Sequence, residues 1–329
     1  MTLNFIFILA GLALLIQGGN LFVAAAVRIA EFLRRPRVVV GSTLVSLATT
    51  TPELVVSIFS GMKGESELAI GNAVGSVICN IGLILGVTAS IKHVEVNPAS
   101  LRVPLAAMFG FGILLFCFTT DLVLSRGQGI VMLVGGVAYF VLDFWRHWRD
   151  KRPADVREAK AIERETAAVA RGWFQSAPGT AIQFLGGAGI VVLGSKLLVD
   201  GAVNVAGALG IPSIVIGLTI VAVGTSLPEL VTAITSSRQS VSDLAVGNIL
   251  GANIANLTMI VGVAAIIQEV RIDHMTMLLN FPAMLLMMLL FLWCLWTDRK
   301  ISREEGWALV FSYGLYLWAL LAITVTGGH

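Results

Sequence analysis

Two glutamates lie in stretches that are otherwise apolar enough to cross a membrane, and each directly follows a proline. Pro52–Glu53 occurs in SLATTTPELVVS, and Pro228–Glu229 occurs in AVGTSLPELVTA. A carboxylate within a membrane helix is costly, and it usually faces a polar cavity or an ion pathway. The two glutamates are therefore the first candidates for chemistry in this chain.

Each proline should also change the backbone beside its glutamate. Proline has no N–H and its ring opposes the carbonyl four residues earlier, so Pro52 should free the carbonyl of Ala48. By the same geometry, Pro228 should free the carbonyl of Gly224. A freed carbonyl inside a membrane needs water, protein or a cation as its partner. We expect each motif to present uncommitted carbonyl oxygens about one helical turn from a carboxylate.

Further oxygen donors are spaced to share a helix face with the glutamates. Thr49 lies four residues before Glu53, and Thr225 four before Glu229. The apolar segment after each motif has polar or small residues at every fourth position, namely Asn72, Ser76 and Asn80, and Asn248, Ala252 and Asn256. Such hard oxygen donors with two negative charges suit Ca²⁺, and Na⁺ can share them. Thiolates and imidazoles do not recur in register, which argues against zinc or copper.

Composition indicates which elements must position these residues. Of the 329 residues, 57% are hydrophobic and only 13% are charged, whereas a soluble domain has about a quarter charged residues. Apolar runs of the length a membrane span needs occur at 3–26, 38–61, 67–91, 101–120, 127–146, 178–200, 211–236, 244–268, 277–297 and 304–326. Because the runs are continuous and do not alternate, a transmembrane β-barrel is excluded. The predicted class is an all-α polytopic membrane protein with ten transmembrane helices.

The chain also repeats itself. From Pro36 to Gly86, 22 of 51 positions match the residue 176 positions later, without a gap. Both Pro–Glu pairs are in register. Each half has five predicted spans, and an odd number reverses the orientation of the second half. The repeats should therefore be inverted, an arrangement in which transporters bind substrate near the membrane midplane on broken helices.

The repeat predicts three parts. These are a first inverted repeat (1–148, motif 36–86), a cytoplasmic linker (149–177) and a second inverted repeat (178–329, motif 212–262). The linker is rich in alanine and in charges of both signs, which predicts a short helix connecting the halves.

The basic residues predict the orientation in the membrane. If the N-terminus is outside, the outside loops hold only Lys63, Arg126 and Arg271, and all other loop lysines and arginines lie inside. We therefore expect both termini to be extracytoplasmic, in a multi-pass protein of the cell (inner) membrane. The N-terminal sequence MTLNF lacks a basic signal region, so the first span should be retained. The bilayer is an expected partner and nucleic acid is not, whereas the oligomeric state is left open.

The remaining reactive residue types do not form an enzymatic site. Cys79, Cys117 and Cys294 lie within predicted spans, and their spacing fits neither a disulfide framework nor a metal site. The four histidines fall in loops or at span ends, and HExxH and Walker motifs are missing from the sequence. We expect a secondary transporter that uses no cofactor and is not an enzyme. A cation channel is the alternative class, and it would conduct without strict coupling.

The motifs GSTLVSLATTTPEL with GNAVGSVICN, and GLTIVAVGTSLPEL with GNILGANIAN, resemble the two α-repeats of the cation/Ca²⁺ exchanger superfamily. The similarity is strongest to prokaryotic Na⁺/Ca²⁺ exchangers, and it extends over all ten spans in layout. The resemblance implies a central Ca²⁺ site flanked by Na⁺ sites, with exchange by alternating access. It also implies that the first and sixth helices slide across the others.

The resemblance assigns roles to residues that match the motifs. Glu53 and Glu229 would be shared anionic ligands, and Thr49 and Thr225 would donate oxygens to Ca²⁺ or Na⁺. Ser46 and Ala222 would offer backbone carbonyls. Thr50, Ser226 and Ser76 would be candidate Na⁺ ligands, and Asn80 would line the centre of the site. Asn256, the equivalent of Asn80 in the second half, completes the expected set.

The chain departs from the family pattern at two positions. The family often has a serine where this chain has Ala252 and an acidic residue where it has Asn256. The first change removes a hydroxyl that could serve a Na⁺ site, and the second removes a negative charge. The alternative reading is an H⁺/Ca²⁺ or K⁺-linked cation antiporter that uses the same glutamates.

Overall fold

A computed structural model describes residues 2–33, 35–63, 66–95, 98–149, 176–209, 222–298 and 300–326 of the chain. Within these ranges, nine helices are long and apolar enough to cross a membrane. The predicted span 211–236 is not among the nine, because 210–221 fall outside the described residues. The predicted linker 149–177 also lies almost entirely outside them. The all-α polytopic class is confirmed, and the difference between nine and ten spans comes from this one segment.

The first half is a series of helices with two short strands. Its elements are α1 (Thr2–Leu33), α2 (Arg37–Val40), η1 (Gly41–Val45), α3 (Ser46–Thr49), α4 (Thr51–Lys63), α5 (Ser66–Cys79), η2 (Asn80–Leu85), α6 (Gly86–Ile91), β1 (Val94–Glu95), α7 (Pro98–Phe118), β2 (Val123–Leu124) and α8 (Arg126–Arg149). The η elements are π-helical turns, which widen a helix locally and are frequent at functional sites.

The second half repeats this order within its described part. Its elements are α10 (Ala177–Ala208), α12 (Ala222–Thr225), α13 (Leu227–Arg238), α14 (Ser242–Ala255), η5 (Asn256–Ile260), α15 (Val261–Ile267), β3 (Val270–Arg271), η6 (Thr276–Asn280), α16 (Phe281–Asp298), β4 (Lys300–Ile301) and α17 (Arg303–Thr326). Helices α5 and α14 begin at equivalent residues, and π-helical turns start at the equivalent Asn80 and Asn256.

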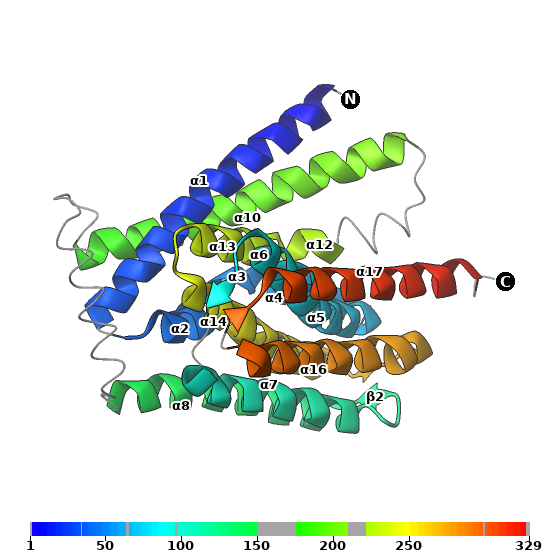
Figure 1. Cartoon of the computed structure of the whole chain (residues 1–329). Helices are drawn as coiled ribbons and strands as arrows, with labels where there is room; N and C mark the ends of the chain where they lie inside the picture. The colour runs from blue at the N-terminus through cyan, green and yellow to red at the C-terminus, as the bar shows by residue number, and fades with distance from the viewer. Residues whose placement is uncertain are drawn as a thin grey trace.

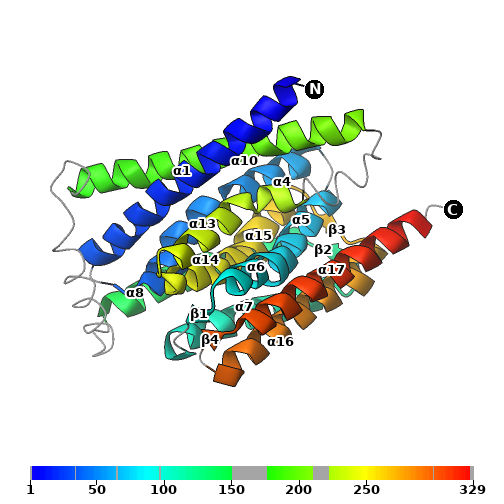
Figure 2. The same ribbon diagram turned by 45° about the horizontal axis from the view of Figure 1, so that its top comes forward.

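The two halves have opposite orientations. Helix α1 runs antiparallel to α10, and α8 runs opposite to α17 (Figure 1). Strand β1 pairs with β4, and β2 pairs with β3, both antiparallel. Figure 2 places these two small sheets at opposite ends of the molecule. A pseudo-two-fold axis exchanges β1 with β3 and β4 with β2, as inverted repeats require.

Helices α5 and α14 form the centre of the bundle. Every residue of α14 from Leu244 to Ala255 is buried, and half of the residues of α5 belong to the hydrophobic core. The apolar sequence of these helices is therefore buried by protein. Large exposed hydrophobic side chains lie instead on outer helices, including Leu9 on α1, Val134 on α8 and Phe311 on α17.

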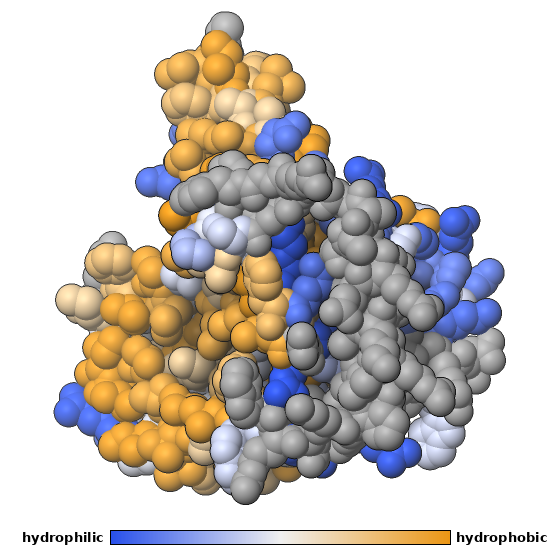
Figure 3. Space-filling view, turned by 90° about the vertical axis from the view of Figure 1, so that its left-hand side faces the viewer, coloured by the Kyte–Doolittle hydropathy of each residue, from blue (hydrophilic) through white to orange (hydrophobic). Residues whose placement is uncertain are grey.

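The surface distribution fits a bilayer environment. Figure 3 views the end of the molecule at the left of Figure 1 and shows apolar residues over the upper and lower-left parts. Hydrophilic residues gather toward the centre and right of that view. Apolar flanks with polar groups at the helix ends are typical of a membrane-spanning bundle.

Helices α1 and α10 lie side by side along one edge of the bundle (Figures 1 and 2). A Cβ atom on Gly11 would lie 2.8 Å from the carbonyl oxygen of Gly194, so the close approach requires glycine. Arg28 Nη1 donates to Gln183 Oε1 at 2.8 Å, and Gln183 Nε2 donates to the Leu21 carbonyl at 3.1 Å. These contacts join the two long helices to each other.

Candidate functional site

Both Pro–Glu helices are interrupted at equivalent residues. Helix α3 ends at Thr49 and α4 begins at Thr51, and the intervening Thr50 has ψ of 1°. Helix α12 ends at Thr225 and α13 begins at Leu227, with ψ of 8° at Ser226. Each break lies two residues before a proline, which is tolerated in the first turn of the helix that follows. The breaks therefore follow from the sequence of each half.

The breaks place both glutamates in the first turn of a new helix. Glu53 lies at the start of α4 and Glu229 at the start of α13. The positive end of the helix dipole favours a carboxylate there. The side chains are 1% and 0% exposed, respectively. Two carboxylates are thus held inside the protein on separate broken helices.

The halves contact each other through reciprocal hydroxyl–carboxylate pairs. Ser226 Oγ donates to Glu53 Oε1 at 3.4 Å, and Thr50 Oγ1 lies 3.4 Å from Glu229 Oε1. Thr50 and Ser226 are equivalent in the repeat, as are the two glutamates. The carboxylates also interact electrostatically with each other. The two breaks therefore meet and form a single site.

Four buried oxygen atoms at this site have no hydrogen-bond donor among the described residues. They form two equivalent pairs, Glu53 Oε2 with Glu229 Oε2, and Asn80 Oδ1 with Asn256 Oδ1. A buried polar atom without a partner costs about 1–3 kcal/mol, more if it is charged. Carboxylate and amide oxygens are ligands of Ca²⁺, so these four atoms are candidate donors to a hard cation. The donor set therefore fits a Ca²⁺ or Na⁺ ion as cargo.

The Ser46 carbonyl lies one turn before the first break and accepts several hydrogen bonds. Its donors are Thr50 N at 2.9 Å, Thr50 Oγ1 at 2.5 Å and Thr49 Oγ1 at 3.3 Å. Thr49 Oγ1 also lies 3.1 Å from Asn248 Oδ1 of α14. An ion bound to the Ser46 carbonyl would share it with the hydroxyls of two other expected ligands.

Helix α14 is held against the first broken helix by close backbone contact. A Cβ atom on Gly247 would lie 2.3 Å from the Val38 carbonyl oxygen, and one on Gly251 would lie 2.3 Å from the Ser42 carbonyl oxygen. Glycine at both positions permits this approach. It brings Asn248, between them in sequence, into contact with Thr49.

Three further expected ligands lie on α5 and α12. Ser76 is buried in α5, one turn before Asn80. Thr225 is the last residue of α12 and is half-buried. Ala222 is the first residue of α12, and its side chain lies outside the described residues, so its expected role concerns only its carbonyl. Short polar contacts thus connect Ser226 with Glu53, Thr50 with Glu229, and Thr49 with Thr50 through the Ser46 carbonyl. Asn80 Oδ1 and both polar atoms of the Asn256 amide have no hydrogen-bond partner among the described residues.

Two residues outside the expected set also belong to this region. Cys79 is buried directly before Asn80, and its thiol interacts with the hydroxyls of Ser226 and Tyr313. Asn253 Oδ1 accepts a hydrogen bond from Asn80 Nδ2 at 2.9 Å. The repeat could not identify either residue, because their equivalents in the other half are Ala255 and Val77. The only sign of Asn253 in the sequence was its place in the GNILGANIAN motif.

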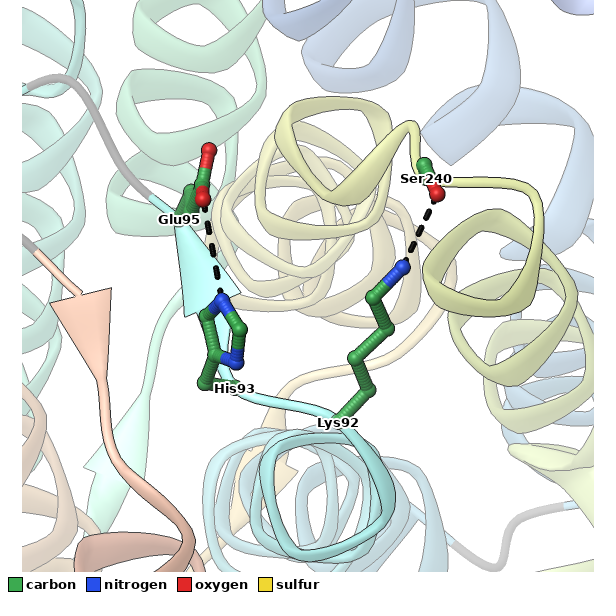
Figure 4. A network of polar contacts seen from close by, with 4 residues as sticks. All are labelled: Lys92, His93, Glu95 and Ser240. Carbon is green, nitrogen blue, oxygen red and sulfur yellow. Dashed lines mark hydrogen bonds and ion pairs between the residues drawn. The ribbon is translucent and has the colours of Figure 1, made fainter.

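A separate polar cluster lies at the far end of α13. Lys92 Nζ donates to Ser240 Oγ at 2.8 Å, and His93 Nε2 lies 3.6 Å from Glu95 Oε1 (Figure 4). The first contact joins the end of α6 to the turn between α13 and α14. It connects the second broken helix to the first repeat.

Comparison with known proteins identifies relatives over nearly the whole chain. The family described as sodium/calcium exchanger protein matches residues 3–145 and 179–322. The sodium/calcium exchanger MaX1 of Methanosarcina acetivorans is 31% identical over 98% of this chain and 99% of that protein. The inner membrane protein YrbG of Escherichia coli (strain K12) is also 31% identical, over 94% of each chain.

Solved structures of one exchanger share the fold. The sodium-calcium exchanger NCX_Mj, soaked with zero Na⁺ and Ca²⁺, superposes with a TM-score of 0.80 at 28% identity, covering 97% of this chain and 99% of that chain. The same exchanger soaked with 2.5 mM Na⁺ and 0.1 mM Ca²⁺ also gives a TM-score of 0.80.

Proposed function

The chain belongs to the sodium/calcium exchanger family, and on that premise we propose that it exchanges Ca²⁺ for Na⁺ at a site formed by its two Pro–Glu helix breaks. It is a multi-pass membrane protein and a secondary transporter of the Na⁺/Ca²⁺ exchanger type, not an enzyme.

The observation that carries the proposal is the pair of equivalent glutamates, whose Oε2 atoms have no hydrogen-bond partner in the described part of the chain. Each carboxylate is bonded through Oε1 to a hydroxyl of the opposite half, which leaves Oε2 for an ion. The equivalent asparagines add two neutral oxygens. Two negative charges and a set of neutral oxygens suit a divalent hard cation.

Coupling follows from the shared ligands. The two carboxylates can neutralise one Ca²⁺, and they cannot also neutralise several Na⁺ ions at the same time. The hydroxyls of Thr50 and Ser226 contact these carboxylates, and in this proposal they contribute to Na⁺ binding. Occupation of the site by one kind of ion therefore excludes the other, and the empty, doubly negative site is disfavoured.

Alternating access would arise from movement of α1 and α10 across the site. The two helices are joined to each other, and α1 also packs on α13, where a Cβ atom on Gly19 would lie 2.5 Å from Val231 Cγ1. Small residues at such a contact let the two helices approach closely. In this proposal the pair moves as one body and opens the site to each side in turn.

The proposed orientation places both termini outside the cytoplasm in the inner membrane. Helix α1 begins and α17 ends on the same side of the molecule (Figure 1), which agrees with an even number of spans. The excess of lysine and arginine in the opposite loops makes that opposite side cytoplasmic.

The direct test is ⁴⁵Ca²⁺ uptake into proteoliposomes under Na⁺, K⁺ and H⁺ gradients applied one at a time. The proposal expects uptake driven by an outward Na⁺ gradient. Uptake with a pH or K⁺ gradient alone would instead support the H⁺- or K⁺-linked antiporter. Uncoupled current that follows only the membrane potential would identify a channel.

A further inference from the structure

We propose that Asn253 is a positioning residue that holds the Asn80 amide with its oxygen toward the ion site. The inference deepens the proposed function and rests on it, because it assigns a role at the same Ca²⁺ site. Neither the repeat nor the family motif assigned a role to Asn253.

Three buried side chains on three helices form a chain of hydrogen bonds, which we call the relay. Asn80 Nδ2 donates to Asn253 Oδ1 at 2.9 Å, and Asn253 Nδ2 donates to Met108 Sδ of α7 at 3.5 Å. All three residues are at most 1% exposed. The relay runs from the bundle core at α7, through α14, to the first residue of the π-helical turn η2.

The chemistry of the three groups determines the direction of the relay. A thioether sulfur can accept a hydrogen bond but cannot donate one. Met108 therefore favours the NH₂ group of Asn253 on its side, which turns Asn253 Oδ1 toward Asn80. Asn80 must then present its own NH₂ group to Asn253, and its Oδ1 is directed away. That oxygen is the atom left without a donor among the described residues.

The second half has no equivalent relay in the described residues. The position equivalent to Asn253 is Val77, which has no polar side-chain atom. The position equivalent to Asn80 is Asn256, and neither its Oδ1 nor its Nδ2 has a hydrogen-bond partner in the described part of the chain. The two amides of the site therefore differ. A hydrogen bond to Asn253 orients the Asn80 amide, whereas no such contact orients the Asn256 amide among the described residues.

A fixed amide matters for cation binding because its two ends have opposite effects. The oxygen attracts a cation and the NH₂ group repels it, so a flipped Asn80 would present hydrogen atoms to Ca²⁺. Partners that orient metal ligands typically contribute 10–100-fold to metal affinity. We place Asn253 at the lower end of this range, because Asn80 is a neutral ligand.

The test measures equilibrium binding of ⁴⁵Ca²⁺ to purified wild-type and variant proteins in detergent. This measurement needs no counter-ion gradient. Asn253→Val introduces the residue of the other half and removes the acceptor for Asn80. It should raise the Ca²⁺ dissociation constant about tenfold while the folded fraction and the number of binding sites stay unchanged. When Asn80 is already replaced by alanine, Asn253→Val should change the Ca²⁺ dissociation constant by less than about twofold. The reason is that the ligand that Asn253 orients is then missing.

Met108→Leu tests the relay with little change of volume and protects the test against misfolding of Asn253→Val. It should also raise the Ca²⁺ dissociation constant, by roughly threefold, because leucine accepts no hydrogen bond and no longer holds the Asn253 NH₂ group on its side. Met132→Leu, at a buried methionine of α8, is the matched control and should bind Ca²⁺ like the wild type.

Several results would overturn the inference. Unchanged Ca²⁺ affinity in both Asn253→Val and Met108→Leu would show that the relay does not orient a ligand. An equal loss of affinity with and without Asn80 would show that Asn253 acts by another route. A wild-type protein that binds no Ca²⁺ would instead overturn the proposed function, and this inference with it. The two failures are therefore distinguishable.

Discussion

Ser226 Oγ donates a hydrogen bond to Glu53 Oε1 at 3.4 Å across the boundary between the two halves of the chain. Applying the pseudo-two-fold to this contact gives the pair Thr50 and Glu229, which has the same length. Each carboxylate is therefore held partly by the half to which it does not belong. A site that needs both halves is suited to a transporter in which one half moves against the other around the site.

Removing the charge of one glutamate should abolish high-affinity Ca²⁺ binding. Glu229→Gln keeps the size of the side chain and leaves a single carboxylate at the site. We expect the Ca²⁺ dissociation constant to rise at least about 100-fold, which corresponds to about 2.8 kcal/mol. Isothermal titration calorimetry with purified protein measures this change.

The control for this variant is Glu67→Gln. Glu67 is an exposed residue in the first turn of α5, away from the breaks. Its substitution should leave the dissociation constant within about twofold of the wild type. Equal losses in the two variants would mean that overall negative charge, and not the buried site, attracts the ion.

The hydroxyls at the breaks should affect Na⁺ more than Ca²⁺. Ser226→Ala and Thr50→Val each remove a hydroxyl that lies 3.4 Å from a carboxylate oxygen of the opposite half. Both should raise the Na⁺ concentration that half-inhibits ⁴⁵Ca²⁺ binding, by roughly threefold to tenfold, with similar values because the positions are equivalent. Ser312→Ala is the control, since its hydroxyl bonds to the Ala308 carbonyl of its own helix. A selective loss of Ca²⁺ binding in these variants would contradict the assignment.

Restoring a backbone N–H at a break should slow exchange without unfolding the protein. Pro52→Ala supplies the N–H that the proline lacks and permits the broken helix to become continuous. We expect the turnover number for Ca²⁺ exchange to fall about tenfold, with a melting temperature equal to or above that of the wild type. Pro104→Ala, at the proline inside α7, is the comparison and should keep the wild-type turnover. A Pro52→Ala protein with normal turnover would show that the break is not needed.

Close packing of α14 should be sensitive to a single methyl group. The Cβ of Gly251→Ala would lie 2.3 Å from the Ser42 carbonyl oxygen and 2.4 Å from Ser46 Oγ. We expect a loss of about 1–3 kcal/mol of stability, seen as a lower melting temperature in detergent. Gly314→Ala, where an added Cβ meets nothing within 4 Å, should be neutral or slightly stabilising. Equal melting temperatures for the two variants would rule out this packing constraint.

Much of the architecture was predictable because the repeat is strong. The matching Pro–Glu pairs and the odd number of spans predicted inverted halves, and the equivalent bounds of α5 and α14 agree with that prediction. The π-helical turns at Asn80 and Asn256 were not predicted. Such a turn depends on how neighbouring helices pack, which hydrophobic pattern alone does not report.

Only part of the candidate site could be predicted from the sequence. The repeat selected residues with equivalent partners, such as Glu53 with Glu229, and the structure brings these together. It could not select Asn253, whose partner position is a valine, nor Cys79, because their roles depend on contacts between different helices. The seventh predicted span begins outside the described residues, so its break is seen only from Ala222 onward.

The central claim is that Na⁺ and Ca²⁺ compete for the paired glutamates. It is tested most directly by ⁴⁵Ca²⁺ uptake into Na⁺-loaded proteoliposomes diluted into Na⁺-free buffer, with wild-type protein and Glu53→Gln side by side. The wild type should accumulate Ca²⁺ only while the Na⁺ gradient lasts, and Glu53→Gln should not accumulate it above protein-free liposomes. Equal Na⁺-driven uptake by the two proteins would contradict the account.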